Sequence, residues 1–114
     1  MPRITRYFAG LADFHEQRHY AFGCLIGNMA LEVTTSSEKV RAKLAMIYRE
    51  WSVALTDCPR EAQVRKELAS GRDVSQLALA LIDAFEGAVM RAKVERNGAP
   101  FDTFERWVLP SLLR

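Results

Sequence analysis

Strand-forming sequence is almost missing from this 114-residue chain. The only run of β-branched residues is Val33-Thr34-Thr35, which is too short to found a sheet. Alanine, leucine, arginine and glutamate are abundant, and all four favour helices. A chain of this length makes one domain with one core. We therefore expect an all-α fold with a single domain over residues 1–114, built from about five helices in an orthogonal or antiparallel bundle.

Apolar residues at steps of three and four divide the chain into five expected helices. Within the third, Pro59 cannot donate a hydrogen bond to the carbonyl of Leu55, and its ring clashes with that turn. The residues after Pro59 return to helical composition, so we expect a kink there rather than a chain reversal. The expected helices run roughly over residues 4–18, 21–33, 37–69, 74–96 and 102–113.

Capping residues mark the ends of the last two expected helices. Asp73 with Gln76, and Asp102 with Glu105, have the spacing of a capping box and predict where the two helices begin. Asn97-Gly98 after the fourth helix predicts a left-handed exit, with a proline just beyond.

The fourth helix is apolar on two faces, one centred on Leu81 and Ala88 and the other on Ile82 and Phe85. A helix of this kind must bury both faces, and the chain's own core covers one. The face that this core leaves uncovered favours a homodimer contact, because large apolar patches usually mark contact sites. The alternative is that the last helix covers this face within one chain. The expected interface residues are Leu77, Leu81, Ala84, Ala88, Ala92, Phe104, Trp107 and Val108.

Charge and composition exclude several classes of protein. The net charge is +2, and the cations are interleaved with acids, so the chain lacks the basic patch that DNA binding needs. It has no 18-residue uncharged apolar run and no signal peptide. Two cysteines are too few for a disulfide framework. We expect a cytoplasmic protein with no membrane partner.

The segment His15-Glu16-Gln17-Arg18-His19 matches the H-E-x-x-H pattern of zinc hydrolases. Its spacing puts two imidazoles on one helix face. However, the helix is expected to end near Arg18, and the chain has no further histidine to act as a third ligand. We expect no enzyme activity, no metal and no cofactor, and keep a small zinc-dependent hydrolase as an alternative.

The expected second helix carries small and polar residues that a plain core helix does not need: Gly23, Cys24, Gly27 and Asn28. An amide in an apolar helix must find a partner in the backbone, water or a ligand. Cys24 is either an inert buried thiol or a reactive one, depending on its surroundings. This pattern indicates one wall of a site that a ligand approaches.

An ordered set of segments covering nearly the whole chain resembles the C-terminal domain of TetR/AcrR-type transcriptional regulators. These segments are Gly23–Glu32, Val40–Leu44, Tyr48–Trp51, Arg60–Gln63, Glu67–Leu68, Leu79–Ala88, Arg91–Glu95 and Phe104–Leu113.

The resemblance implies an effector-sensing and dimerisation domain of a repressor, in which the last two helices of each subunit form a four-helix bundle. The implied effector is a small apolar or electrophilic molecule. DNA is bound only by an N-terminal helix-turn-helix domain that this sequence lacks, so the chain is either a fragment or a natural stand-alone protein. A helical dimerisation module without a ligand is a further alternative. The candidate pocket residues are Phe8, Leu11, Phe14, Cys24, Asn28, Ile47, Trp51, Leu55 and Phe85.

Overall fold

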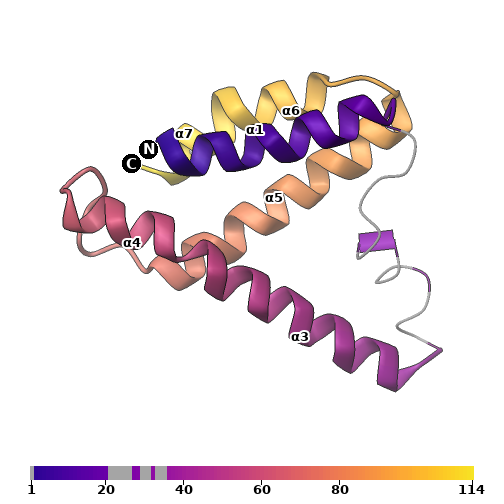
Figure 1. The fold of residues 1–114 in the computed structure, drawn as a ribbon, viewed down its shortest axis with the longest axis horizontal. Coiled ribbons are helices and arrows are strands. Elements are labelled where there is room, and N and C mark those ends of the chain that lie inside the picture. Colours follow the sequence, from indigo (N-terminus) through magenta and orange to yellow (C-terminus); the bar gives the residue numbers. More distant parts are fainter. Residues whose placement is uncertain (1, 21–26, 29–31, 33–35) are drawn as a thin grey trace.

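The computed structural model describes residues 2–20, 27–28, 32 and 36–114 (Figure 1). These residues form helices and no strand, which confirms the all-α prediction. Most of the expected second helix lies outside the described residues, although Gly27, Asn28 and Glu32 are helical. The helices are α1 (Pro2–Gln17), α3 (Glu38–Leu55), α4 (Asp57–Val64), α5 (Val74–Glu95), α6 (Ala99–Thr103), the π-helix η1 (Phe104–Val108) and α7 (Leu109–Leu112).

Helix α5 is the central element of the fold. In Figure 1, α1 and the α6–η1–α7 segment run side by side over one part of α5, whereas α3 meets α5 near its start and then extends away. Helix α5 has many apolar residues on both faces, and most are buried within the chain. Its buried side chains are Leu77, Ala78, Leu81, Ile82, Phe85, Ala88, Val89 and Ala92.

Three phenylalanines form the centre of the core. Phe8 from α1 packs against Phe85 at 5.1 Å and Phe104 at 5.0 Å between ring centroids, and Phe85 lies 5.3 Å from Phe104. All three are almost completely buried. Tilted and edge-on aromatic pairs at this spacing add to the stabilisation from burial, so this cluster fixes α1, α5 and η1 to one another.

The expected kink at Pro59 is present as a break between α3 and α4. The amide of Thr56 closes α3 on the carbonyl oxygens of Ser52 and Val53, at 3.1 and 3.2 Å. Thr56 keeps right-handed helical angles (φ −66°, ψ −21°), so the chain bends without reversing. Helix α4 ends at Val64 rather than at Ala69 as expected, because the chain turns through a left-handed Lys66 (φ 62°) and carries Leu68 into the core.

Helices α3 and α5 begin with side-chain caps. Ser37 accepts a hydrogen bond from the amide of Val40 at the start of α3. At the start of α5, Asp73 accepts from the amides of Ser75 and Gln76, as the sequence predicted. These caps satisfy amides that have no partner inside the helix.

The exit from α5 differs from the expectation. The left-handed residue is Arg96 (φ 56°), one position before Asn97, while Gly98 has φ −90°. The last helical segment then begins at Ala99 rather than Asp102. Asn97 Oδ1 accepts from the Ala99 amide at 2.9 Å and supplies the start signal. Pro100 fits the first turn because that turn leaves its amides unpaired inside the helix.

A π-helix interrupts the last helical segment. The amide of Leu109 donates to the carbonyl of Phe104, five residues back, which is the π-helical pattern. Pro110 follows at once, and a proline cannot donate to Arg106 and crowds its carbonyl. The wider turn relieves this conflict. As a result Phe104 and Leu109 are both buried, whereas Trp107 is 67% exposed.

Candidate functional site

Two surfaces of the described chain combine exposed apolar side chains with a defined arrangement of neighbours. The first we call the aromatic wall: Tyr7 and Phe14 of α1 with Tyr48 and Trp51 of α3. Trp51 Nε1 donates to the Tyr7 hydroxyl at 2.7 Å, and the Trp51 and Tyr48 rings are stacked with centroids 6.3 Å apart. Tyr7 is 39% exposed and Phe14 47%. Residues seven apart on α1 share a face, so Phe14 continues the aromatic surface of α1 two turns beyond Tyr7.

Phe14 marks the end of the aromatic wall, next to the C-terminus of α1. The Arg18 guanidinium carbon lies 3.6 Å from the Phe14 ring centroid, and Arg18 Nη1 donates to the Phe14 carbonyl at 3.0 Å. The cation is therefore held on the aromatic face and on a carbonyl that α1 leaves open at its end.

The predicted pocket residues separate into three groups. Phe8, Leu55 and Phe85 are core residues with at most 5% exposure, so they support the aromatic wall from behind. Asn28 is helical and half-buried, and Cys24 lies outside the described residues. Leu11, Phe14, Ile47 and Trp51 keep accessible surface. Sequence reasoning left out Tyr7, although its place on the apolar face of α1 was visible.

The two histidines of the H-E-x-x-H match lie in different environments. His15 is 8% exposed and its ring stacks on Phe101 at 5.7 Å. Burial, together with the nearby Arg18 cation, lowers the pKa of His15 below its ordinary value. His19 lies beyond the last residue of α1, is exposed and has a left-handed backbone (φ 53°). Among the described residues, no three histidine, cysteine or acidic side chains are placed to hold a metal ion.

The second surface we call the α5–η1 groove. It is a shallow groove of about 260 Å³ between α5 and the α6–η1 segment. The α5 side is made of small residues around Gly87, and a Cβ added at Gly87 would meet nothing within 4 Å. Trp107 follows three residues after Phe104 and is largely exposed nearby. The lining residues are Ala84, Gly87, Ala88, Arg91, Pro100, Thr103, Phe104 and Val108.

The predicted interface residues divide at this groove. Leu77, Leu81 and Ala92 have at most 4% exposure in the single chain, because α1, α3 and the last helical segment cover them. For these three residues, the alternative reading holds: other helices of the same chain cover them. Ala84 and Val108 are half-buried and Trp107 is exposed, while Ala88 and Phe104 form the floor of the groove.

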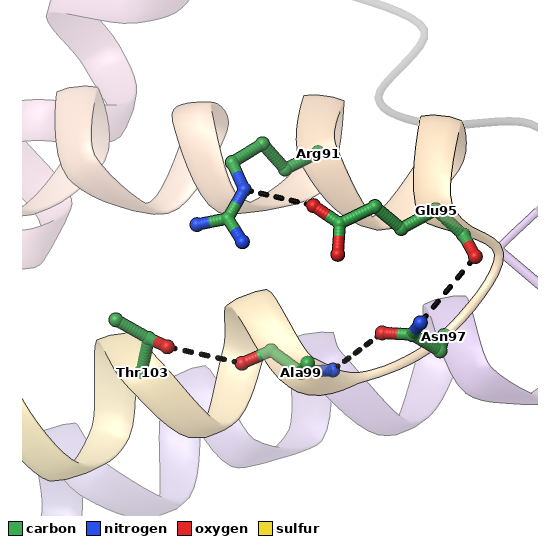
Figure 2. Close-up of polar contacts among 5 residues, drawn as sticks. All are labelled: Arg91, Glu95, Asn97, Ala99 and Thr103. Atoms are coloured by element: carbon green, nitrogen blue, oxygen red, sulfur yellow. Dashed lines mark hydrogen bonds and ion pairs between the residues drawn. The ribbon is translucent and has the colours of Figure 1, made fainter.

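A series of polar contacts runs along α5, across the α5–α6 turn and along α6, beside the α5–η1 groove (Figure 2). Arg91 Nε pairs with Glu95 Oε2 at 3.0 Å along α5, and Thr103 Oγ1 donates to the Ala99 carbonyl at 3.2 Å along α6. Asn97 bridges the two helices through the Glu95 carbonyl and the Ala99 amide. The turn between α5 and α6 is thus fixed, which sets the width of the groove.

A third hollow of about 230 Å³ lies between the start of α1 and α4. An ion pair of 2.7 Å joins Arg3 and Glu61 across it, between side chains that are both more than half exposed. Cys58 is half-buried at the edge of this hollow, and burial raises the pKa of its thiol. A raised pKa disfavours the reactive thiolate.

None of the described helices has the length and apolar character to cross a lipid bilayer.

Comparison with known proteins gives consistent matches. Residues 1–108 match the family described as tetracyclin repressor-like, C-terminal domain. The chain is 35% identical over 115 residues to the HTH-type transcriptional repressor DhaR of Mycobacterium sp. (strain GP1), covering 97% of this chain and 54% of the relative. It is 34% identical over 102 residues to the transcriptional regulator AcuR of Cereibacter sphaeroides, covering 89% and 47%. The chain thus spans about half the length of these relatives. No solved structure matches it.

Proposed function

Because the chain belongs to the tetracyclin repressor-like (TetR) C-terminal domain family, we propose that it is the effector-sensing and dimerising part of a transcriptional repressor. In this proposal a small apolar or electrophilic molecule is the effector. A DNA-binding domain, for which the longer relatives leave room, carries out the response. The function belongs in the cytoplasm, where a bacterial regulator meets DNA.

The α5–η1 groove is the observation that carries the dimer part of the proposal. Small residues on α5 allow a second helix to approach closely, and Gly87 has open space where a partner helix would lie. The exposed Trp107 adds the kind of large aromatic surface that is enriched at interfaces.

The aromatic wall supports the effector part. Its rings lie on α1 and α3, and its Tyr7 and Phe14 rings remain exposed to a ligand. Ligand sites are usually apolar and aromatic with a few fixed polar groups.

Helix α1 supplies a physical route between the two surfaces. Tyr7 and Phe14 belong to the wall, while Phe8 and His15 on the adjoining face pack against Phe85, Phe101 and Phe104. A ligand that moves α1 relative to α3 therefore also acts on the packing of α5 and η1. Coupling of this kind is a free energy shared between two sites.

Two measurements on the purified chain test the proposal. Chromatography with light scattering is expected to give twice the mass of one chain at micromolar concentration. A thermal-shift screen of small apolar and electrophilic compounds is expected to raise the melting temperature, because a ligand that binds only the folded state stabilises it by mass action. A monomer would contradict the dimer. A dimer that no compound stabilises would favour a helical dimerisation module without a ligand.

A further inference from the structure

We infer that the Tyr7 hydroxyl is the polar anchor of the effector site, and that the effector is a small, uncharged, planar molecule with one hydrogen-bond acceptor, such as a carbonyl oxygen. This inference rests on the proposed effector function and concerns the same aromatic wall.

The first argument is the hydrogen bonding of Tyr7. Its oxygen accepts from Trp51 Nε1 at 2.7 Å, and a phenol that accepts one hydrogen bond still has one proton to donate. Among the described residues no acceptor for that proton is found. An accepted hydrogen bond polarises the O–H group and strengthens it as a donor. With 39% exposure, Tyr7 can offer this donor to an incoming molecule.

The second argument is the shape of the surface beside Tyr7. The Trp51 and Tyr48 rings are nearly parallel, with an angle of 23° between their planes. Aromatic faces of this kind favour offset stacking with a flat partner. The indole N–H of Trp51 is used by Tyr7, so the Trp51 ring contributes apolar surface and leaves Tyr7 as the donor.

The third argument is charge. Tyr7, Tyr48, Trp51 and Phe14 are all uncharged at neutral pH. The cation fixed on the wall is Arg18, which is held on Phe14 and its carbonyl, and Phe14 lies about 10 Å along α1 from Tyr7 by helical rise. Arg3, one turn before Tyr7, is paired with Glu61. An anion placed beside Tyr7 would therefore lose water without gaining a direct ion pair with either of these cations, which is unfavourable. The wall therefore suits a neutral carbonyl compound.

Nuclear magnetic resonance of the whole chain tests the inference directly. The sequence has two tryptophans, so the spectrum has two indole N–H signals, and the Trp107→Phe variant identifies the one from Trp51. The probes are acetophenone, which has a ring and a carbonyl, ethylbenzene, which lacks the acceptor, and benzoate, which is charged. Acetophenone is expected to shift the Trp51 signal saturably and to bind about five- to tenfold more tightly than ethylbenzene, the effect of one hydrogen bond.

Two matched variants locate the donor. Tyr7→Phe is expected to remove the preference for acetophenone over ethylbenzene while ethylbenzene binding persists. Tyr48→Phe removes a hydroxyl from the same wall and is expected to keep the preference. A preference that survives Tyr7→Phe, or that is lost equally in Tyr48→Phe, would overturn the assignment of the anchor.

The remaining outcomes separate this inference from the proposed function. Tighter binding of benzoate than of acetophenone, or no saturable shift with acetophenone, overturns the neutral carbonyl class. The effector function itself fails only if no compound in the broader thermal-shift screen stabilises the chain. A compound of another class that stabilises the chain without moving the Trp51 signal would keep the function and overturn the inference.

Discussion

Helices α5 and α3 are similar in length but differ in how they are held. Helix α5 has 22 residues and buries eight of them, from Leu77 to Ala92. Helix α3 has 18 residues and buries three: Leu44, Ser52 and Leu55. Buried apolar surface is the main source of stability, and regions with little of it open more easily. The difference indicates a rigid half around α5 and a lightly held half around α3.

The largest effect on the free energy of unfolding is expected from a substitution in the core of the rigid half. Phe85→Ala removes the ring that touches both Phe8 and Phe104. We expect the free energy of unfolding to fall by about 3–5 kcal/mol, measured by urea denaturation. Phe14→Ala, at a ring that is 47% exposed, is the matched control and should have a much smaller effect. Equal losses would show that burial of the Phe85 ring does not hold the rigid half together.

The next largest effect is expected at the groove. Gly87→Arg places a charge where the single chain has open space, beside Arg91 in the same groove. We expect dimer dissociation to become about 100-fold more favourable, since like charges at an interface cost several kcal/mol. Concentration-dependent light scattering measures this, and circular dichroism checks that the helices remain. Gly10→Arg, at an exposed helical glycine with equally open space, should leave the dimer intact. A dimer that persists in Gly87→Arg would place the interface elsewhere.

The lightly held half is tested at its bond to α1. Trp51→Phe removes the N–H that donates to Tyr7 and keeps an aromatic ring. We expect a loss of about 1 kcal/mol, typical of one hydrogen bond, seen as about fivefold faster hydrogen exchange of the α3 amides. The α5 amides should be unaffected, and Trp107→Phe should leave α3 unchanged. Uniformly faster exchange would mean that α3 and α5 open together.

The smallest effect is expected in the pH dependence of stability, through His15, whose ring packs against the rigid half. His15 has a pKa below its ordinary value of 6.5 in the folded chain, so the unfolded chain binds its proton more readily. Stability should therefore decrease as the pH falls below about 6.5. The His15→Phe variant should lose this part of the slope, and His19→Gln, at an exposed histidine, should keep it. Denaturant midpoints between pH 7 and 5 measure both. Identical slopes in the two variants would exclude His15 as the cause.

Local patterns in the sequence predicted most of the fold. The spacing of apolar residues predicted the positions of α1, α3 and α5. Asp73 predicted the start of α5, and Pro59 predicted the bend between α3 and α4. These features depend on neighbours within one turn, which a sequence displays directly. The end of α4 and the exit of α5 were misplaced by a few residues because Leu68 is drawn to a distant core and Asn97 caps from outside the helix.

The candidate site was less predictable. Leu77 and Leu81 share a helix face with Ala84 and Ala88, so periodicity could not tell which of them the last helical segment would cover. Likewise, Tyr7 and Trp51 are 44 residues apart in sequence, and their hydrogen bond exists only once α3 has folded against α1. Contacts of this range are set by tertiary packing, which residue spacing does not contain.

The π-helix changes the phase of the last helical segment. In an uninterrupted α-helix, the residue facing the core four positions after Phe104 would be Val108. The wider turn delays the inward position by one residue, so Leu109 is buried and Trp107 and Val108 are turned aside. One extra residue in a turn thus changes which of the following side chains face the core. The same shift leaves the Trp107 side chain 67% exposed on the surface of the single chain.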